Sequence, residues 1–130
     1  MPEQTSRRAK VALTALVAGY LAMAVVAGAP NSPLTVLLPT GASPPSWAHS
    51  LASATGLADL GRQGLTAVAW ALLGAVVASF AVVVLEAWSQ RIRLRAVLTA
   101  AGASLLVAVA APLLLSRDVY TYAAYGRVEG

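Results

Sequence analysis

Three uncharged apolar runs constrain the fold of this chain more than any other feature. They cover residues 11–29, 64–85 and 96–115, and each is close to the roughly 20 residues that a helix needs to cross a hydrocarbon core. No water reaches the backbone in such a core, so each run is predicted to be an α-helix that pairs its own N–H and C=O groups. Charged residues make up only 11% of the chain, against about a quarter in a soluble domain. We therefore predict an all-α integral membrane protein with three transmembrane helices.

The basic residues flank these runs and indicate how the chain crosses the bilayer. They form two groups: Arg7, Arg8 and Lys10 before the first run, and Arg91, Arg93 and Arg95 between the second and the third. Loops rich in Lys and Arg stay cytoplasmic, so the tail 1–10 and the loop 86–95 are predicted to be inside the cell. The loop 30–63 and the segment 116–130 are then extracytoplasmic in a multi-pass protein of the cell membrane. Because the net charge of +4 is spread around apolar runs, no nucleic-acid partner is predicted.

The first run also has some features of a signal peptide. Basic residues precede it, and it ends in Ala27-Gly28-Ala29. However, Pro30 would directly follow the cut, and the run is longer than the 7–15 residues usual for a signal peptide. We therefore expect residues 11–29 to stay in the protein as a helix.

The loop 30–63 divides into two halves of different composition. Five prolines fall within residues 30–45, which predicts extended or turn-like backbone there. Ser46 is predicted to cap a short interfacial helix over residues 47–60. One side of this helix would hold Trp47, Leu51, Ala54 and Ala58. A plain connector without an interfacial role is the alternative.

Small residues recur four positions apart and predict close helix packing. The pairs are Ala15 and Gly19, Ala24 and Gly28, and Gly74 and Ala78. Asp59 and Arg62 are spaced for an exposed ion pair one turn apart, which would contribute about 0.2–0.5 kcal/mol.

Several kinds of chemistry are excluded by what the sequence lacks. The chain has no cysteine, and His49 is its only histidine. A disulfide, a thiolate metal site and a histidine metal cluster are therefore impossible, and we assign no metal ligands. There is no glycine-rich phosphate loop, serine triad or metalloprotease motif.

Reactive polar residues concentrate in one place, directly after the third apolar run. This segment contains Arg117, Asp118, Tyr120, Tyr122, Tyr125 and Arg127. Pro112 is predicted to disturb the last helical turn before it. If the segment is helical, Asp118, Tyr122 and Tyr125 share one face, which would suit a sugar. Arg117 and Arg127 match the oxygens of a phosphate.

Spacing alone is consistent with two roles for Asp118, a catalytic base and a helix cap. It is suited to act as a base toward an acceptor hydroxyl. Its oxygens are also candidate ligands for a divalent cation. Ser116 or Asp118 would equally cap a helix that starts there, and the tyrosines and arginines would form an anchoring belt at the bilayer surface. Spacing by itself favours the cap and the belt.

Residues 115–126 resemble the acidic-loop signature of actinobacterial α-(1→6)-mannopyranosyltransferases, which use polyprenyl-phosphate mannose and have the C-type glycosyltransferase fold. The resemblance covers about a tenth of the chain, and the upstream helices agree with the family in character only. It implies that Asp118 is catalytic. It also implies a lipid-linked or cell-wall mannan acceptor and transfer with inversion. It adds no individual role for Arg117, Tyr120, Tyr122, Tyr125 or Arg127.

The family is several times longer than this chain, so we expect the chain to correspond to an N-terminal part of a larger polytopic bundle, inactive by itself. A small three-helix membrane protein with a structural or assembly role is the alternative. A transporter segment is least favoured, because no charged residue falls within the three apolar runs.

Overall fold

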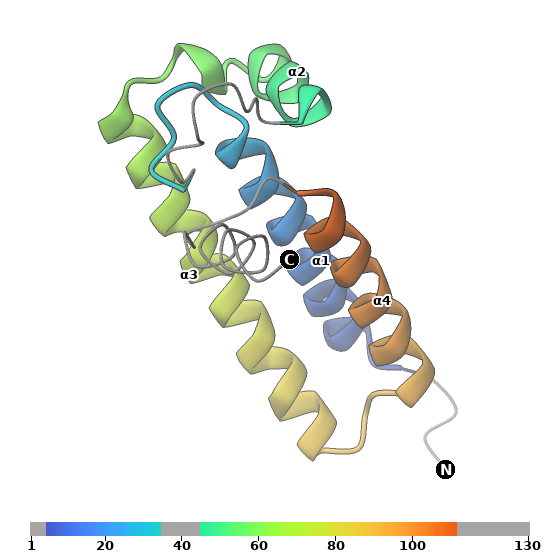
Figure 1. Cartoon of the computed structure of the whole chain (residues 1–130). Coiled ribbons are helices and arrows are strands. Elements are labelled where there is room, and N and C mark those ends of the chain that lie inside the picture. The colour runs from blue at the N-terminus through green and yellow to red at the C-terminus, as the bar shows by residue number, and fades with distance from the viewer. Residues whose placement is uncertain (1–4, 35–44, 112–130) are drawn as a thin grey trace, which may run out of the picture.

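A computed structural model describes residues 5–34 and 45–111, and this part of the chain folds into helices without strands. The elements are α1 (Arg7–Ala27), α2 (Ser46–Ala54), the 3-10 helix η1 (Leu57–Asp59), α3 (Arg62–Trp88) and α4 (Leu94–Ala110) (Figure 1). The prediction of an all-α fold is confirmed for these residues. The parts of the loop 30–63 and of the segment 96–130 that fall outside them are not described.

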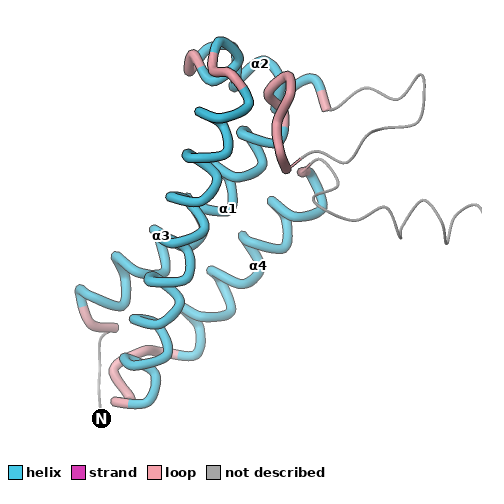
Figure 2. Tube along the Cα trace, turned by 90° about the vertical axis from the view of Figure 1, so that its left-hand side faces the viewer, coloured by secondary structure: helices cyan, strands magenta, loops and turns pink. Residues whose placement is uncertain are grey.

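The three long helices form a bundle in which α1 takes the central position. Helix α3 runs antiparallel to α1, and α4 runs parallel to it on another side (Figures 1 and 2). Helix α1 contacts α2, α3 and α4. We call one end of the bundle the α2 end, which contains α2, η1, the start of α3 and the ends of α1 and α4. We call the other the loop end, which contains residues 5–6, the connection 89–93 and the start of α4.

Two helices are long and apolar enough to cross a membrane. Helix α1 has 21 residues and α3 has 27, which correspond to about 32 and 40 Å at 1.5 Å per residue. Helix α3 includes the whole of the predicted run 64–85. Helix α1 begins earlier than the run 11–29 and includes all three basic residues that precede it.

Helix α4 is shorter, with 17 residues, or about 26 Å. It starts two residues before the predicted run 96–115 and ends at Ala110. Ala111 is extended, with φ −74° and ψ 155°. The next residue is Pro112, whose ring disfavours helical backbone in the residue before it. Pro112 itself and residues 113–115 lie outside the described residues.

The buried core lies at the α2 end. Its residues come from the end of α1, the turn after it, α2 and the start of α3: Val25, Val26, Ala27, Ala29, Leu34, Ala52, Leu65 and Ala69. Leu65 and Val26 are the largest side chains that are fully buried. Residues far apart in sequence therefore hold the α2 end together.

The prediction of a helix over 47–60 capped by Ser46 was wrong in its end and in its cap, since α2 ends at Ala54 and the 3-10 helix η1 follows it. Ser46 is the first helical residue of α2 and does not cap it, because Pro45 takes the cap position without a side-chain hydrogen bond. The buried face consists of Ala48 and Ala52, whereas Leu51 is exposed. Long-range packing explains the burial of Ala48, since a Cβ added to Gly28 would lie 2.5 Å from the backbone carbon of Ala48. Only a methyl side chain fits at such a close approach.

The small-residue pairs have mixed outcomes. A Cβ added to Gly19 would lie 2.5 Å from Val76 Cγ2, so Gly19 lets α1 and α3 approach closely. Gly28 allows the approach of α2 described above. The prediction was wrong for Gly74, where an added Cβ would meet nothing within 4 Å.

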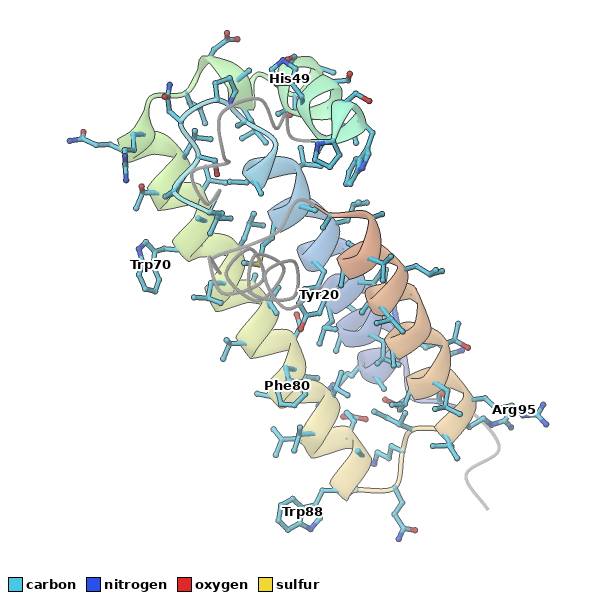
Figure 3. The ribbon with its side chains drawn as sticks, viewed as in Figure 1. Tyr20, His49, Trp70, Phe80, Trp88 and Arg95 are labelled. Carbon is cyan, nitrogen blue, oxygen red and sulfur yellow. The ribbon has the colours of Figure 1, made fainter. Side chains whose placement is uncertain are left out.

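Helix α3 exposes an apolar surface along most of its length. Trp70, Phe80 and Trp88 are 68%, 59% and 85% exposed, and Trp70 and Trp88 point away from the bundle (Figure 3). An exposed apolar surface of this extent is unfavourable in water. No described element packs over this surface. The hydrocarbon core of a bilayer is one environment that would cover it.

Candidate functional site

The predicted catalytic residue and its neighbours lie outside the described residues. This holds for Asp118 and for all five weaker candidates: Arg117, Tyr120, Tyr122, Tyr125 and Arg127. The helix-face and helix-cap hypotheses for this segment, Ser116 included, lie outside them too. The structure does describe the helix that leads to the segment, because α4 ends at Ala110 at the α2 end of the bundle.

Helix α2 contacts the ends of both neighbouring helices at this place. The indole Nε1 of Trp47 donates a hydrogen bond of 3.0 Å to the carbonyl oxygen of Ala110, the last residue of α4. His49 Nδ1 lies 3.4 Å from the carbonyl oxygen of Gly28, which follows α1. The indole satisfies a backbone carbonyl that a helix end leaves without a partner, and the Nδ1–H tautomer of His49 would do the same for Gly28. Trp47 thus positions the end of α4 against α2.

An apolar pocket of about 410 Å³ lies beside this junction, between α1, α2, η1 and α3. Leu21, Val25, Leu57 and Leu72 are among the residues that line it. Among the described residues its one polar side chain is Thr55, whose hydroxyl already donates to the carbonyl of Leu51 at 2.7 Å. The described lining can therefore accommodate an apolar group but offers no group for acid–base chemistry.

The loop end contains a polar cluster that sequence reasoning missed. Glu86 is buried in the last turn of α3. Ser6 Oγ donates a hydrogen bond of 2.5 Å to Glu86 Oε2 and accepts one of 3.0 Å from the backbone N–H of Ala9. The same hydroxyl therefore caps α1 and contacts the carboxylate of α3.

The connection between α3 and α4 completes this cluster. Gln90 is left-handed, with φ 53°, and the N–H of Arg91 donates to the carbonyl of Glu86 at 2.9 Å. This is the pattern of a Schellman cap, in which glycine is the usual left-handed residue. The Arg91 carbonyl accepts from the N–H of Ser6 at 3.0 Å. The N-terminal segment is thereby held against the connection.

Glu86 had been assigned to the cytoplasmic loop 86–95 because the apolar run ends at Leu85. One signal was available: an acid in the last turn of a helix is unfavourable beside the partial negative charge there, so it needs a donor. Nothing in the local sequence identifies Ser6, 80 residues away, as that donor. Every acceptor and donor named in the cluster is already engaged, which indicates a structural role.

Neither a metal site nor the expected surface ion pair occurs in the described part of the chain. No group of three or more His, Asp or Glu side chains comes together there. No ion pair joins Asp59 to Arg62, although both residues are described. The divalent-cation hypothesis concerned Asp118 and is not addressed by these residues.

Comparison with protein families, curated proteins and solved structures finds no match to this chain. The fold therefore defines the class of protein by itself: an all-helical chain with two helices long and apolar enough to cross a membrane, and a third, shorter apolar helix.

Proposed function

We propose that this chain is an integral membrane protein whose helices α1, α3 and α4 cross the bilayer. The exposed apolar surface of α3 supports this, since lipid would cover side chains that water disfavours. Helix α4 buries none of its residues and exposes Leu98, Leu105 and Val109. A helix that is apolar all round is typical of a membrane span.

The arrangement of basic residues supports an orientation with the loop end in the cytoplasm. Both basic groups lie at this end, because the hydrogen bond between Ser6 and Arg91 joins the start of α1 to the connection before α4. The described part of the α2 end carries one arginine, Arg62. Such an asymmetry is the usual cytoplasmic signature. The chain after Ala111 would then begin on the extracytoplasmic side.

We further propose that residues 116–127 contribute to a site that transfers mannose from polyprenyl-phosphate mannose to a lipid-linked or cell-wall mannan acceptor. The observation that carries this proposal is the acidic-loop pattern around Asp118. Its support from the fold is that α4 delivers the chain to the end of the bundle opposite the basic residues. A lipid-linked donor keeps its phosphate and sugar at such a membrane surface.

The proposed chemistry is a single displacement with inversion. Asp118 takes the proton from the acceptor hydroxyl as its oxygen forms a bond to the anomeric carbon. The bond from that carbon to the phosphate oxygen breaks, and the lipid phosphate leaves. Arg117 and Arg127 provide guanidinium groups to stabilise the phosphate charge. The tyrosines provide a surface for the sugar.

The test is mannosyl transfer in membranes that contain the native protein or its Asp118→Asn variant. With labelled polyprenyl-phosphate mannose as donor, we expect the variant to lose transfer by at least about 100-fold, the usual minimum for a general base. Asp59→Asn is the matched control, because Asp59 is the only other aspartate and lies exposed in η1. It should transfer normally. Equal transfer by both variants at equal protein level refutes the proposal.

A further inference from the structure

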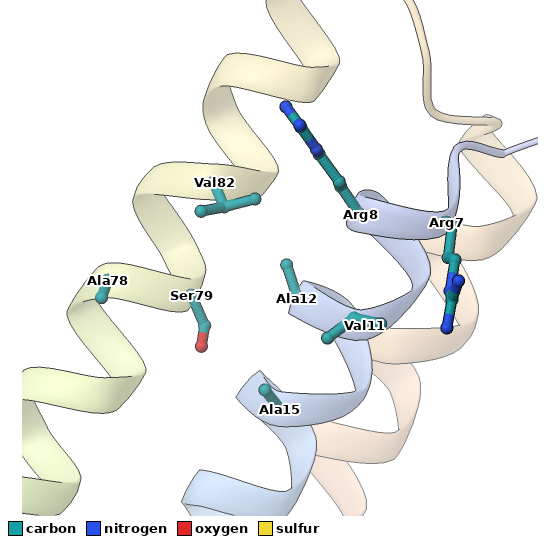
Figure 4. A pocket seen from close by; sticks show the side chains of 8 residues that line it. All are labelled: Arg7, Arg8, Val11, Ala12, Ala15, Ala78, Ser79 and Val82. Atoms are coloured by element: carbon teal, nitrogen blue, oxygen red, sulfur yellow. The ribbon is translucent and has the colours of Figure 1, made fainter.

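A second hollow lies at the loop end, between α1 and α3. It is a groove of about 620 Å³, within the range of about 300–1,000 Å³ typical of ligand sites. Its walls are mainly apolar, with Val11, Ala12 and Ala15 from α1 and Ala78 and Val82 from α3. Ser79 of α3 adds one hydroxyl to the lining. Arg8 extends from α1 toward α3 at its mouth, whereas Arg7, which also lines the groove, points along the other side of α1 (Figure 4).

Two contacts between the helices explain why the groove exists. Helices α1 and α3 touch at Gly19 and Val76, and the segment before α1 meets α3 through the hydrogen bond of Ser6 to Glu86. Between these points the facing residues include alanines, which are too small to fill the space. The groove extends from Arg8 to Ala15, about 10 Å along the axis of α1.

Arg7 and Arg8 are exposed and have no ion pair or side-chain hydrogen bond among the described residues. The one acid nearby within that part of the chain is Glu86, which accepts from Ser6. The groove thus combines a space suited to a hydrocarbon chain with one cation, Arg8, that extends across its mouth, and a second, Arg7, beside it on the same helix. The guanidinium fork matches phosphate oxygens.

We infer that this groove binds an anionic phospholipid, with an acyl chain between α1 and α3 and the headgroup phosphate on Arg8, while Arg7 adds positive charge beside it. Charge complementarity decides the occupant, because basic pockets between membrane helices favour anionic headgroups. A free phosphate ion would leave the apolar part of the groove empty, and an apolar helix would leave the two arginines without a partner. The site rests on the proposed membrane insertion and not on mannosyl transfer.

The test is native mass spectrometry of the purified protein, titrated with phosphatidylglycerol or with phosphatidylcholine of the same acyl chains. We expect phosphatidylglycerol to bind about tenfold more tightly. The double variant Arg7→Gln/Arg8→Gln should lower that affinity about tenfold, the effect of one lost charge-assisted hydrogen bond. Arg93→Gln/Arg95→Gln removes the same charge from the loop end without touching the groove, and should retain binding.

A second pair of variants tests the apolar part of the groove. Ala78→Phe should fill the groove and weaken both lipids several-fold, whereas Ala81→Phe changes an exposed alanine of α3 that does not line it. Circular dichroism checks that each variant stays helical. Asp118→Asn should bind phosphatidylglycerol normally even when it loses transfer, so the two proposals fail separately.

Three results would overturn the inference. The first is equal affinity for the two phospholipids. The second is equal loss from the two arginine pairs, which would indicate a general charge effect. The third is a protein dimer that carries no phosphatidylglycerol and dissociates on Ala78→Phe, which would assign the groove to a second copy of the chain.

Discussion

The hydrogen bond between Ser6 and Glu86 makes a quantitative prediction about stability. Ser6→Ala removes two contacts at once, the cap on the N–H of Ala9 at 3.0 Å and the donor to Glu86 Oε2 at 2.5 Å. Loss of a serine cap costs about 1 kcal/mol. Loss of a hydrogen bond to a charged group costs about 1.5–3 kcal/mol. Because Ser6 is only half-buried, we expect the lower end of the sum, about 2.5 kcal/mol.

A double-mutant cycle separates the two contributions. In a Glu86→Leu background the carboxylate is gone, so Ser6→Ala should cost only the cap, about 1 kcal/mol. The coupling between the two positions should therefore be about 1.5 kcal/mol. Ser89→Ala is the control, because its hydroxyl bonds only to the carbonyl of Leu85 in the same helix. We expect a change below about 0.5 kcal/mol there.

The assay is the free energy of unfolding in mixed micelles, obtained by titration with sodium dodecyl sulfate and followed by circular dichroism. Distant, independent sites add to within about 0.5 kcal/mol. A coupling below that value would refute the argument that Ser6 joins α1 to α3 through Glu86, even if Ser6→Ala alone destabilises the protein.

The same titration checks three further predictions. Gly19→Leu should lower the free energy of unfolding by about 1–3 kcal/mol, because the new side chain overpacks against Val76. Gly74→Leu should be neutral or stabilising, because the space around Gly74 is open. Equal losses would contradict the packing of α1 against α3. Gln90→Gly should stabilise by about 1 kcal/mol, because it relieves a left-handed glutamine, and a loss would contradict the cap assignment. The Ser104 hydroxyl oxygen is buried without a hydrogen-bond partner in the described region, so Ser104→Ala should be neutral or stabilise by about 1 kcal/mol, and a clear loss would show a missed contact.

The positions of the long helices could be predicted from sequence because one physical rule determines them. An uncharged run of about 20 residues must pair its backbone internally in lipid. The run 64–85 falls within α3, and the run 11–29 falls within α1 except for its last two residues. The start of α1 at Arg7 could not be predicted, since basic residues look like a flank. Their inclusion in the helix depends on the cap at Ser6, which is held in place by Glu86.

The buried face of α2 could not be predicted from the sequence for a similar reason. Local periodicity places Trp47 and Leu51 on one apolar side of an interfacial helix and does not show which residues pack against the rest of the chain. The structure buries Ala48 and Ala52, because Gly28 brings two backbones together and leaves no room for larger side chains. Such a choice depends on a contact between residues 20 apart. The groove beside Arg8 likewise depends on where α1 and α3 touch.

For the candidate site, the sequence identifies the residues, whereas the structure describes only the helix that leads to them. Asp118 stands out in the sequence because it is a carboxylate directly after an apolar run, in a pattern that resembles a known acidic loop. Asp118 lies outside the described residues, so its role stays a prediction. The structure adds the contact of Trp47 with Ala110, which relates the end of α4 to α2.

The most direct test of the account is whether the two ends of the bundle lie on opposite faces of a membrane. The chain has no cysteine, so Ser50→Cys in α2 and Gln90→Cys in the connection before α4 each introduce a unique, exposed thiol. A membrane-impermeant maleimide should label Ser50→Cys in intact cells and Gln90→Cys only after permeabilisation. Labelling of both thiols in intact cells, or recovery of the protein in the soluble fraction, would contradict the account.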